Sequence, residues 1–143
     1  MEQQNHMQVV FDAKSENEGL ARMLVTAFMS EMNPTLEQIA DVKTAVSEAV
    51  TNAIIHGYEN EMESVCLSCD RDGQQLVVTV EDKGVGIADV EQAMQPFYTT
   101  KPQLERSGMG FAFMEAFMDE LEVHSAKGSG TTVIMRKRIG VEN

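Results

Sequence analysis

Three short motifs in this chain contain acid, amide, hydroxyl, cationic and glycine residues, at spacings that could bring these groups together in a reactive site. The first contains Glu48 and Asn52, four residues apart in an apolar-periodic segment that ends at Gly57. At 100° per residue, both fall on one helix stripe. A carboxylate and an amide one helical turn apart are suited to act on a nucleophile and to bind Mg²⁺, because Mg²⁺ accepts oxygen ligands together with waters and phosphates. The alternative is a solvated helix face.

The second motif places Asp82, Gly84 and Gly86 directly after a strand-like segment. Glycine permits a positive φ and close backbone approach, so this segment could wrap a flat ring or phosphates. A carboxylate at the strand end could accept a hydrogen bond from the exocyclic amine of adenine. Guanine lacks a donor at that ring position, so the contact would select adenine. The alternative is an ordinary turn after a strand.

The third motif joins hydroxyl and cationic side chains to a glycine-rich helix start. Its members are Thr99, Thr100, Lys101, Arg106, Gly108 and Gly110. Hydroxyls and cations beside free N–H groups at a helix N-terminus suit phosphate binding, because the helix dipole also favours anions. The pattern GxxxxGK[ST] is absent from the sequence, so this is not a Walker P-loop. The alternative is a surface loop.

The surrounding patterns predict the elements that position these motifs. A strand is expected at residues 7–11, and Ser15–Glu18 is a capping-box pattern that opens a helix. The predicted buried face of this helix is Leu20, Met23, Leu24, Ala27 and Phe28. A second helix is expected to begin at Asn33-Pro34 and to close at Gly57. Its predicted buried face is Leu36, Ile39, Val46, Val50 and Ala53.

Alternating segments predict the remaining strands. Two are expected at 64–71 and 75–81, joined by a tight turn at Asp72-Gly73, and two more at 121–125 and 131–138. A short helix at 89–94 and another at 111–118 complete the order. This order predicts a two-layer α/β sandwich in which helices cover one face of a mixed β-sheet, with residues 1–143 forming a single domain.

Composition narrows the function classes. The net charge of -12 argues against direct nucleic-acid binding, which requires clustered cations. No apolar run approaches the roughly 20 residues of a membrane span, and the first residues lack a signal-peptide pattern, so a cytoplasmic protein is expected. Cys66 and Cys69 form a single CxxC and would point to opposite faces of a strand, which disfavours zinc or redox chemistry.

Together the three motifs resemble the ATP site of the superfamily that includes gyrase, Hsp90 chaperones, histidine kinases and MutL. Residues 47–58, 99–111 and 117–120 more specifically resemble the anti-sigma F factors of endospore-forming bacteria. The resemblance implies a Bergerat-type fold that holds Mg-ATP under a lid, here at about 96–107. Ala112 stands where histidine kinases commonly have a third glycine.

The resemblance also implies what such a protein would do. It would bind sporulation sigma F and keep it from RNA polymerase, and it would use Mg-ATP to phosphorylate an anti-anti-sigma factor on serine. It would work as a homodimer. One alternative is an ATP-gated module that sequesters a related, general-stress sigma factor without phosphotransfer. Another is a detached histidine kinase catalytic domain, against which Ala112 counts.

Residue roles follow from the same resemblance. Glu48 would be the general base, Asn52 would bind Mg²⁺, and Asp82 would read adenine in a pocket shaped by Gly84 and Gly86. The lid would contribute Thr99, Thr100, Lys101 and Arg106 to the phosphates, and the cradle would contribute Gly108 and Gly110. Thr131 would lie near the adenine pocket, although a plain hairpin turn is the alternative. Arg22 would contact a partner protein or, alternatively, be a solvated helix arginine.

Overall fold

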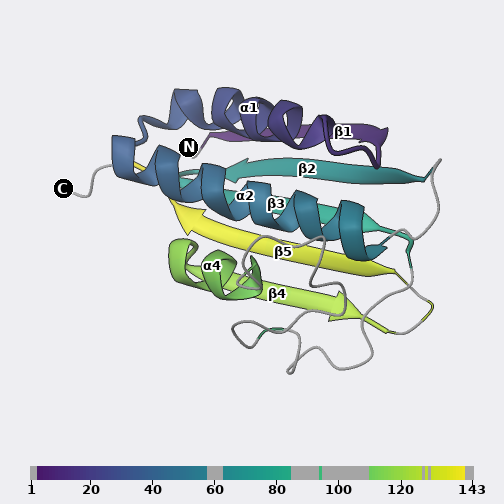
Figure 1. The fold of residues 1–143 in the computed structure, drawn as a ribbon. Coiled ribbons are helices and arrows are strands. Elements are labelled where there is room, and N and C mark those ends of the chain that lie inside the picture. Colours follow the sequence, from purple (N-terminus) through teal and green to yellow (C-terminus); the bar gives the residue numbers. More distant parts are fainter. Residues whose placement is uncertain are drawn as a thin grey trace.

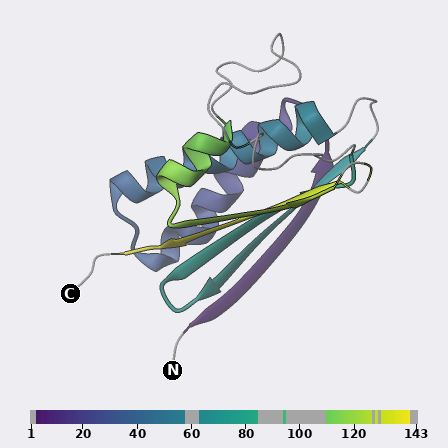
Figure 2. The same ribbon diagram turned by 90° about the horizontal axis from the view of Figure 1, so that it is seen from below.

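The protein is built of two layers, a five-stranded sheet and the helices that cover one of its faces (Figures 1 and 2). The computed structural model describes residues 3–57, 63–84, 94, 110–126, 128 and 130–140. The elements are β1 (Gln4–Asp12), α1 (Asn17–Met29), a 3₁₀ turn (Ser30–Met32), α2 (Leu36–Gly57), β2 (Ser64–Asp72), β3 (Gln75–Asp82), α4 (Gly110–Phe117), β4 (Glu120–Ser125) and β5 (Thr131–Arg138). The predicted strands and the two-layer arrangement are confirmed.

The strand order is β1-β2-β3-β5-β4, and each neighbouring pair among these strands is antiparallel. The expectation of a mixed sheet is therefore wrong. Two helices, rather than one, connect β1 to β2, so the chain reverses once more than in a parallel crossover. β3 and β4 run in the same direction, but β5 lies between them and separates them.

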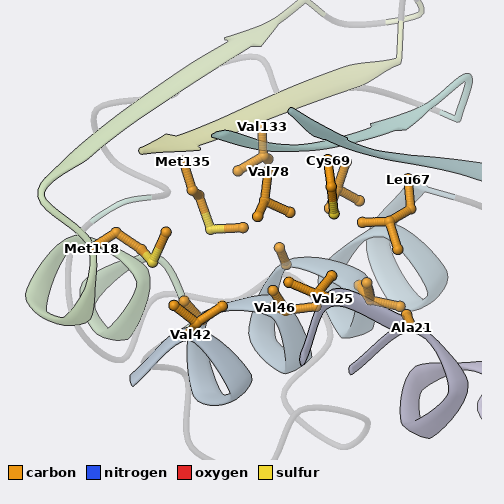
Figure 3. Close-up of a cluster of buried hydrophobic side chains, with 14 of the residues drawn as sticks. Ala21, Val25, Val42, Val46, Leu67, Cys69, Val78, Met118, Val133 and Met135 are labelled. Carbon is orange, nitrogen blue, oxygen red and sulfur yellow. The ribbon is translucent and has the colours of Figure 1, made fainter. Parts of the chain in front are cut away.

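The core lies between the sheet and the helices, where side chains from both layers meet (Figure 3). The sheet contributes alternate residues of its central strands, such as Leu67, Val78 and Met135, each of them fully buried. α2 contributes Val46 and Val50 in agreement with the predicted face. Burying a side chain of this size stabilises the fold by about 1.5–3 kcal/mol. This packing holds α2, and the motif it carries, at a fixed height above the sheet.

α1 buries a different face from the predicted one. Its buried residues are Ala21, Val25 and Met29. Leu20 and Met23 of the predicted face are 45% and 72% exposed. α1 has apolar residues on two sides, and periodicity alone does not decide which side meets the sheet. Leu36 at the start of α2 is also exposed, at 86%, because the first turn of this helix extends beyond the core.

The helix starts also differ from expectation. Glu16 caps α1 without any side-chain hydrogen bond, so the predicted capping box at Ser15 is wrong. The reciprocal pattern instead opens α2. The Thr35 hydroxyl accepts from the Gln38 N–H at 3.1 Å, and the Gln38 side chain accepts from the Thr35 N–H at 3.0 Å. α2 therefore begins about two residues later than Pro34, and it ends at Gly57 as predicted.

The two cysteines lie on β2 and face opposite sides of the sheet, as predicted. Cys69 is fully buried on the helix side, and burial together with the nearby charge of Asp70 raises the pKa of its thiol to about 12. Cys66 is half-buried on the other face, where the Gln8 side-chain amide donates to its sulfur at 3.0 Å. These two thiols therefore cannot bind one metal ion together. Among the described residues, no helix is both long and apolar enough to span a membrane.

Candidate functional site

The first and third motifs meet where α4 begins beside α2. A Cβ added at Gly110 would lie 2.9 Å from Asn52 Nδ2 and 3.4 Å from Glu48 Oε2. Only glycine fits there without moving the Asn52 amide. The structure thus brings Gly110 next to Glu48 and Asn52, which lie more than 50 positions earlier in the sequence. This close approach explains why a glycine opens α4. This helix face is covered by α4 at Gly110 rather than fully solvated.

A lysine from the sheet fixes the opposite end of α4. Lys137 on β5 donates from Nζ to the carbonyl oxygen of Phe117 at 2.7 Å. The same ammonium lies 3.9 Å from carboxylate oxygens of Asp41 on α2 and of Asp119 after α4. A cation at a helix C-terminus is favourable because the carbonyl ends of the helix are partly negative. Since Asp41 precedes Glu48 along α2, the two helices run antiparallel and Gly110 is held beside Glu48.

The second motif builds a separate group of polar residues at the end of β3. Asp82 pairs in register with Thr131, and Thr131 pairs with Ser125 on β4. Asp82 and Thr131 are buried, with exposed fractions of 6% and 9%. The Asp82 carboxylate accepts from the N–H of Gly84 at 2.8 Å and from the backbone N–H of Thr131. This is a preformed acceptor on the helix-facing side of the sheet.

The surroundings of Asp82 set its acidity. Removal from water raises the pKa of its carboxyl above the ordinary value, and the nearby charge of Glu81 adds to this. The N–H groups of Gly84 and Thr131 act in the opposite direction without cancelling the effect of burial. A buried carboxylate with room for one more donor is suited to bind an amine of a ligand.

Gly130 brings the β4–β5 turn against the backbone at the end of β3. Its φ is 76°, a conformation that favours glycine, and an added Cβ would lie only 2.3 Å from the backbone oxygen of Asp82. The turn and the end of β3 therefore touch backbone to backbone. The ends of β3 and β4, the start of β5 and the carboxyl end of α2 all lie at one side of the molecule (Figure 1). The group formed by Glu48, Asn52 and Gly110 and the group formed by Asp82 and Thr131 are thus neighbours at this side of the molecule.

The residues present fit a magnesium nucleotide. Asp82 offers an acceptor for adenine, while Asn52 offers an amide oxygen for Mg²⁺ and Glu48 a carboxylate beside it. The missing Cβ of Gly110 leaves space next to the amide and exposes the N-terminus of α4, where an anion is favoured.

A groove of about 450 Å³ between α1 and α2 reaches the same glutamate. It is lined by Arg22, Leu36, Ile39, Ala40, Lys43, Thr44, Ser47 and Glu48. Arg22 is held at its border by an ion pair with Glu18 at 3.0 Å. The candidate partner-contact arginine and the candidate base therefore line one groove, which the sequence did not indicate.

Several predicted residues lie outside the described part of the chain. They are Gly86, Thr99, Thr100, Lys101, Arg106 and Gly108, together with the proposed lid at about 96–107 and all but the last residue of the proposed helix at 89–94. Sequence patterns did not single out Lys137, which donates to the Phe117 carbonyl, or Ser125, which donates to the Gly130 carbonyl. Lys137 stands between Arg136 and Arg138 on β5, and only the register of this strand shows that Lys137 is the one that faces the helices.

Comparison with known proteins agrees with this arrangement. The profile of the histidine kinase-like ATPase domain matches residues 11–137. The chain therefore belongs to the class of histidine kinase-like ATPase domains, to which the resemblance pointed. Within that class, it belongs to the family of anti-sigma F factors, as the following relatives establish.

The chain is 56% identical over 133 residues to the anti-sigma F factor of Clostridium kluyveri, covering 93% of this chain and 94% of that protein. It is 55% identical to the anti-sigma F factor of Clostridium perfringens strain SM101, covering 94% and 97% of the two chains. A crystal structure of the RsbU and RsbW domains of a Mycobacterium tuberculosis protein shares its fold, with a TM-score of 0.70 at 21% identity. That match covers 96% of this chain and 33% of the other.

Proposed function

We propose that this single-domain protein is a cytoplasmic anti-sigma factor that binds sporulation sigma F and keeps it from RNA polymerase. We further propose that it is a serine kinase that uses Mg-ATP to phosphorylate, and so inactivate, an anti-anti-sigma factor. The observation that carries the kinase proposal is the meeting of Glu48, Asn52 and Gly110 at the start of α4. Family membership supports the sigma-binding half.

In this proposal Glu48 is the general base. Its carboxylate accepts the proton of the incoming serine hydroxyl while the serine oxygen forms a bond to the γ-phosphorus, and the bond from that phosphorus to the β–γ bridging oxygen breaks. ADP leaves with the bridging oxygen. Asn52 holds Mg²⁺, which when bound neutralises negative charge on the phosphates. Phosphoryl transfer depends mainly on positioning and charge stabilisation, and a base contributes about 10²–10⁴-fold.

The remaining contacts to ATP are assigned by the family resemblance. Asp82 binds the adenine amine beside Gly84, Gly86 and Thr131. The lid residues that would bind phosphate are Thr99, Thr100, Lys101 and Arg106, and the cradle glycines are Gly108 and Gly110. The position of Gly110 beside Asn52 supports the cradle assignment for that residue.

The α1–α2 groove is the proposed approach of the phosphate acceptor. It runs from Arg22 to Glu48, so a serine-bearing segment lying in it would deliver its hydroxyl to the base. Arg22 and Lys43 would favour an acidic segment, while Leu36 and Ile39 offer apolar contact. No role for direct nucleic-acid or membrane binding is proposed.

We also propose that the protein is a homodimer. Leu20 and Met23 form an exposed apolar stripe on α1 beside β1, a strand with one neighbour in the described sheet. An unpaired strand edge next to apolar surface favours association. Met23→Glu should convert a dimer to a monomer in sedimentation equilibrium, because it places a charge in that stripe. Leu36→Glu, a matched change at an exposed leucine in the groove, should leave the dimer intact; a dimeric Met23→Glu protein would contradict the assignment.

The test of the kinase proposal is phosphotransfer. The protein is mixed with the anti-anti-sigma factor and Mg-ATP labelled at the γ-phosphate, and the labelled residue is identified. Label on a serine of the partner is expected. ATP binding and sigma F binding without label would instead favour an ATP-gated module that sequesters its sigma factor without phosphotransfer. The anti-sigma proposal is tested by adding the protein to sigma F and RNA polymerase. If sigma F still binds the polymerase, that result would contradict the proposal.

A further inference from the structure

We propose that Lys137 on β5 is a positioning residue for phosphate transfer, because it ties the end of α4 to α2 and so keeps Gly110 in line with Asn52. This inference rests on the proposed kinase function. None of the three motifs contains Lys137. The alignment of the phosphate site is thereby assigned in part to a side chain that acts about two helical turns away from it.

Lys137 contacts both helices where α4 ends. Its ammonium donates from Nζ to the carbonyl oxygen of Phe117, the last residue of α4, at 2.7 Å. The same atom lies 3.9 Å from a carboxylate oxygen of Asp41 on α2. The side chains of Lys137 and Asp41 are only 13% and 23% exposed. Charges withdrawn from water need such partners, and salt screens them less than charges on an open surface. Lys137 is therefore a specific link between the helices rather than a solvated cation.

The two helices span the same length between this link and the candidate site. Gly110 and Phe117 are seven positions apart on α4. Asp41 and Glu48 are also seven positions apart, on α2. At a rise of about 1.5 Å per residue, each pair spans about 10 Å. α4 contains neither proline nor a further glycine after Gly110, so a shift of its end at Phe117 carries over to Gly110.

Apolar packing holds α4 on the sheet beside α2 (Figure 1). Its buried side chains include Phe111 and Met114, and Met118 follows directly after the helix. Apolar burial is non-directional, so it fixes which face of α4 is covered more strongly than it fixes α4 along its own axis. A hydrogen bond to the helix end supplies that direction.

Asp119 fastens the chain after α4 to the sheet. Its N–H donates to the carbonyl oxygen of Arg136 at 2.8 Å, and its carboxylate accepts from the N–H of Arg138 at 2.7 Å. Both of these bonds run to β5. Lys137, between the two arginines, adds a link to α2, which is the helix that carries Asn52. The alignment of Gly110 with Asn52 depends on this second link.

The start of α4 tolerates little displacement. A Cβ added at Gly110 would lie only 2.9 Å from Asn52 Nδ2, so α4 and this amide are already close together. A misplacement of about 1 Å at a reacting site can cost about 10²-fold in rate. Asp82, the proposed adenine contact, lies on β3 and is held by the N–H groups of Gly84 and Thr131. Loss of Lys137 should therefore affect transfer and leave adenosine binding unchanged.

The experiment compares neighbouring substitutions on β5 in the full chain. Lys137→Met keeps an apolar stem and removes the charge and the donor. It should lower kcat for serine phosphorylation by about 10- to 100-fold, with an unchanged adenosine affinity by calorimetry. Lys137→Arg keeps a cation with N–H donors and should restore most of the turnover. Arg136→Met, the matched control, removes ion pairs with Glu120 and Glu122 on the other face of the sheet and should change neither quantity.

A second readout needs no nucleotide. The NMR signals of the Asn52 side-chain amide should shift in Lys137→Met and stay in place in Arg136→Met. A lysine that only stabilises α4 would lower the free energy of unfolding and leave both the Asn52 signals and the turnover of the folded protein unchanged. That result would overturn the inference.

Asp41→Asn carries the test if Lys137→Met does not fold. It weakens the link to α2 and should lower kcat by about two- to fivefold, the range of a partly exposed ion pair, with adenosine affinity unchanged. Wild-type turnover in Asp41→Asn would then overturn the inference. A wild-type protein that transfers no phosphate would instead overturn the proposed function, and the nucleotide-free Asn52 signals distinguish the two failures.

Discussion

The helix side and the sheet side of the candidate site are built in different ways. Glu48 and Asn52 are half-buried side chains on α2, and α4 leaves them space through a missing Cβ at Gly110. Asp82 and Thr131 are buried, and backbone N–H groups together with their strand neighbours hold them. The helix side thus offers half-buried polar side chains beside the space left at Gly110, whereas the sheet side offers a buried acceptor held by hydrogen bonds. Changes on the first should affect transfer, and changes on the second should affect base binding and stability.

The largest expected effect lies on the helix side. Glu48→Gln should lower the rate of serine phosphorylation by about 10²–10⁴-fold, because the amide cannot accept the serine proton. ATP affinity should remain unchanged, since Asp82 and Asn52 are intact. Glu37→Gln, in the first turn of the same helix and outside the groove, is the matched control. Normal transfer by Glu48→Gln would remove Glu48 from the role of base.

On the sheet side, Asp82→Asn should weaken ATP binding by about 10- to 100-fold, the value of a hydrogen bond to a charged group. The asparagine amide can rotate to present a donor to the adenine amine, and it lacks the charge that strengthens the bond. Titration calorimetry measures the change. An ATP affinity equal to that of the wild type would place Asp82 outside the pocket.

Two glycines on helices sharpen the comparison further. Gly110→Ala should reduce Mg-ATP affinity by roughly tenfold, because its methyl group displaces the Asn52 amide that would lie 2.9 Å away. Gly19→Ala meets only Arg22 at 3.7 Å, an ordinary contact, so it should leave nucleotide affinity unchanged and stabilise α1 by about 0.5–1 kcal/mol. Calorimetry and urea unfolding measure the two effects. Equal nucleotide affinity in both variants would contradict the cradle at Gly110.

The smallest expected effect is the pH dependence of stability. Burial raises the pKa of Asp82 in the folded state, so the folded protein binds this proton more tightly than the unfolded chain does. Relative to Asp82→Asn, the wild type should therefore gain stability as the pH falls through the raised pKa toward the ordinary value of 3.8. Urea unfolding of both proteins between pH 7 and 4 measures this. A wild type that loses stability relative to the variant in that range would contradict the direction of the shift.

Sequence patterns predicted the strands and the position of α2 because alternation and helical periodicity are local. They did not predict which face of α1 is buried, since Leu20 and Met23 satisfy the same periodicity as Ala21 and Val25. The motifs predicted Glu48, Asn52 and Asp82 as polar site residues. The contact of Lys137 with the end of α4 could not be found this way, because it depends on the strand order β3-β5-β4, which is set by long-range pairing.

The central claim is that the helix side and the sheet side bind one nucleotide. NMR titration of the full chain tests it most directly, with the Asn52 side-chain amide reporting on the first side and the Gly84 and Thr131 backbone amides on the second. Mg-ATP should shift all of these signals with one dissociation constant, whereas adenosine should shift only those of Gly84 and Thr131. Shifts confined to one side with saturating Mg-ATP, or two different dissociation constants, would contradict a single site.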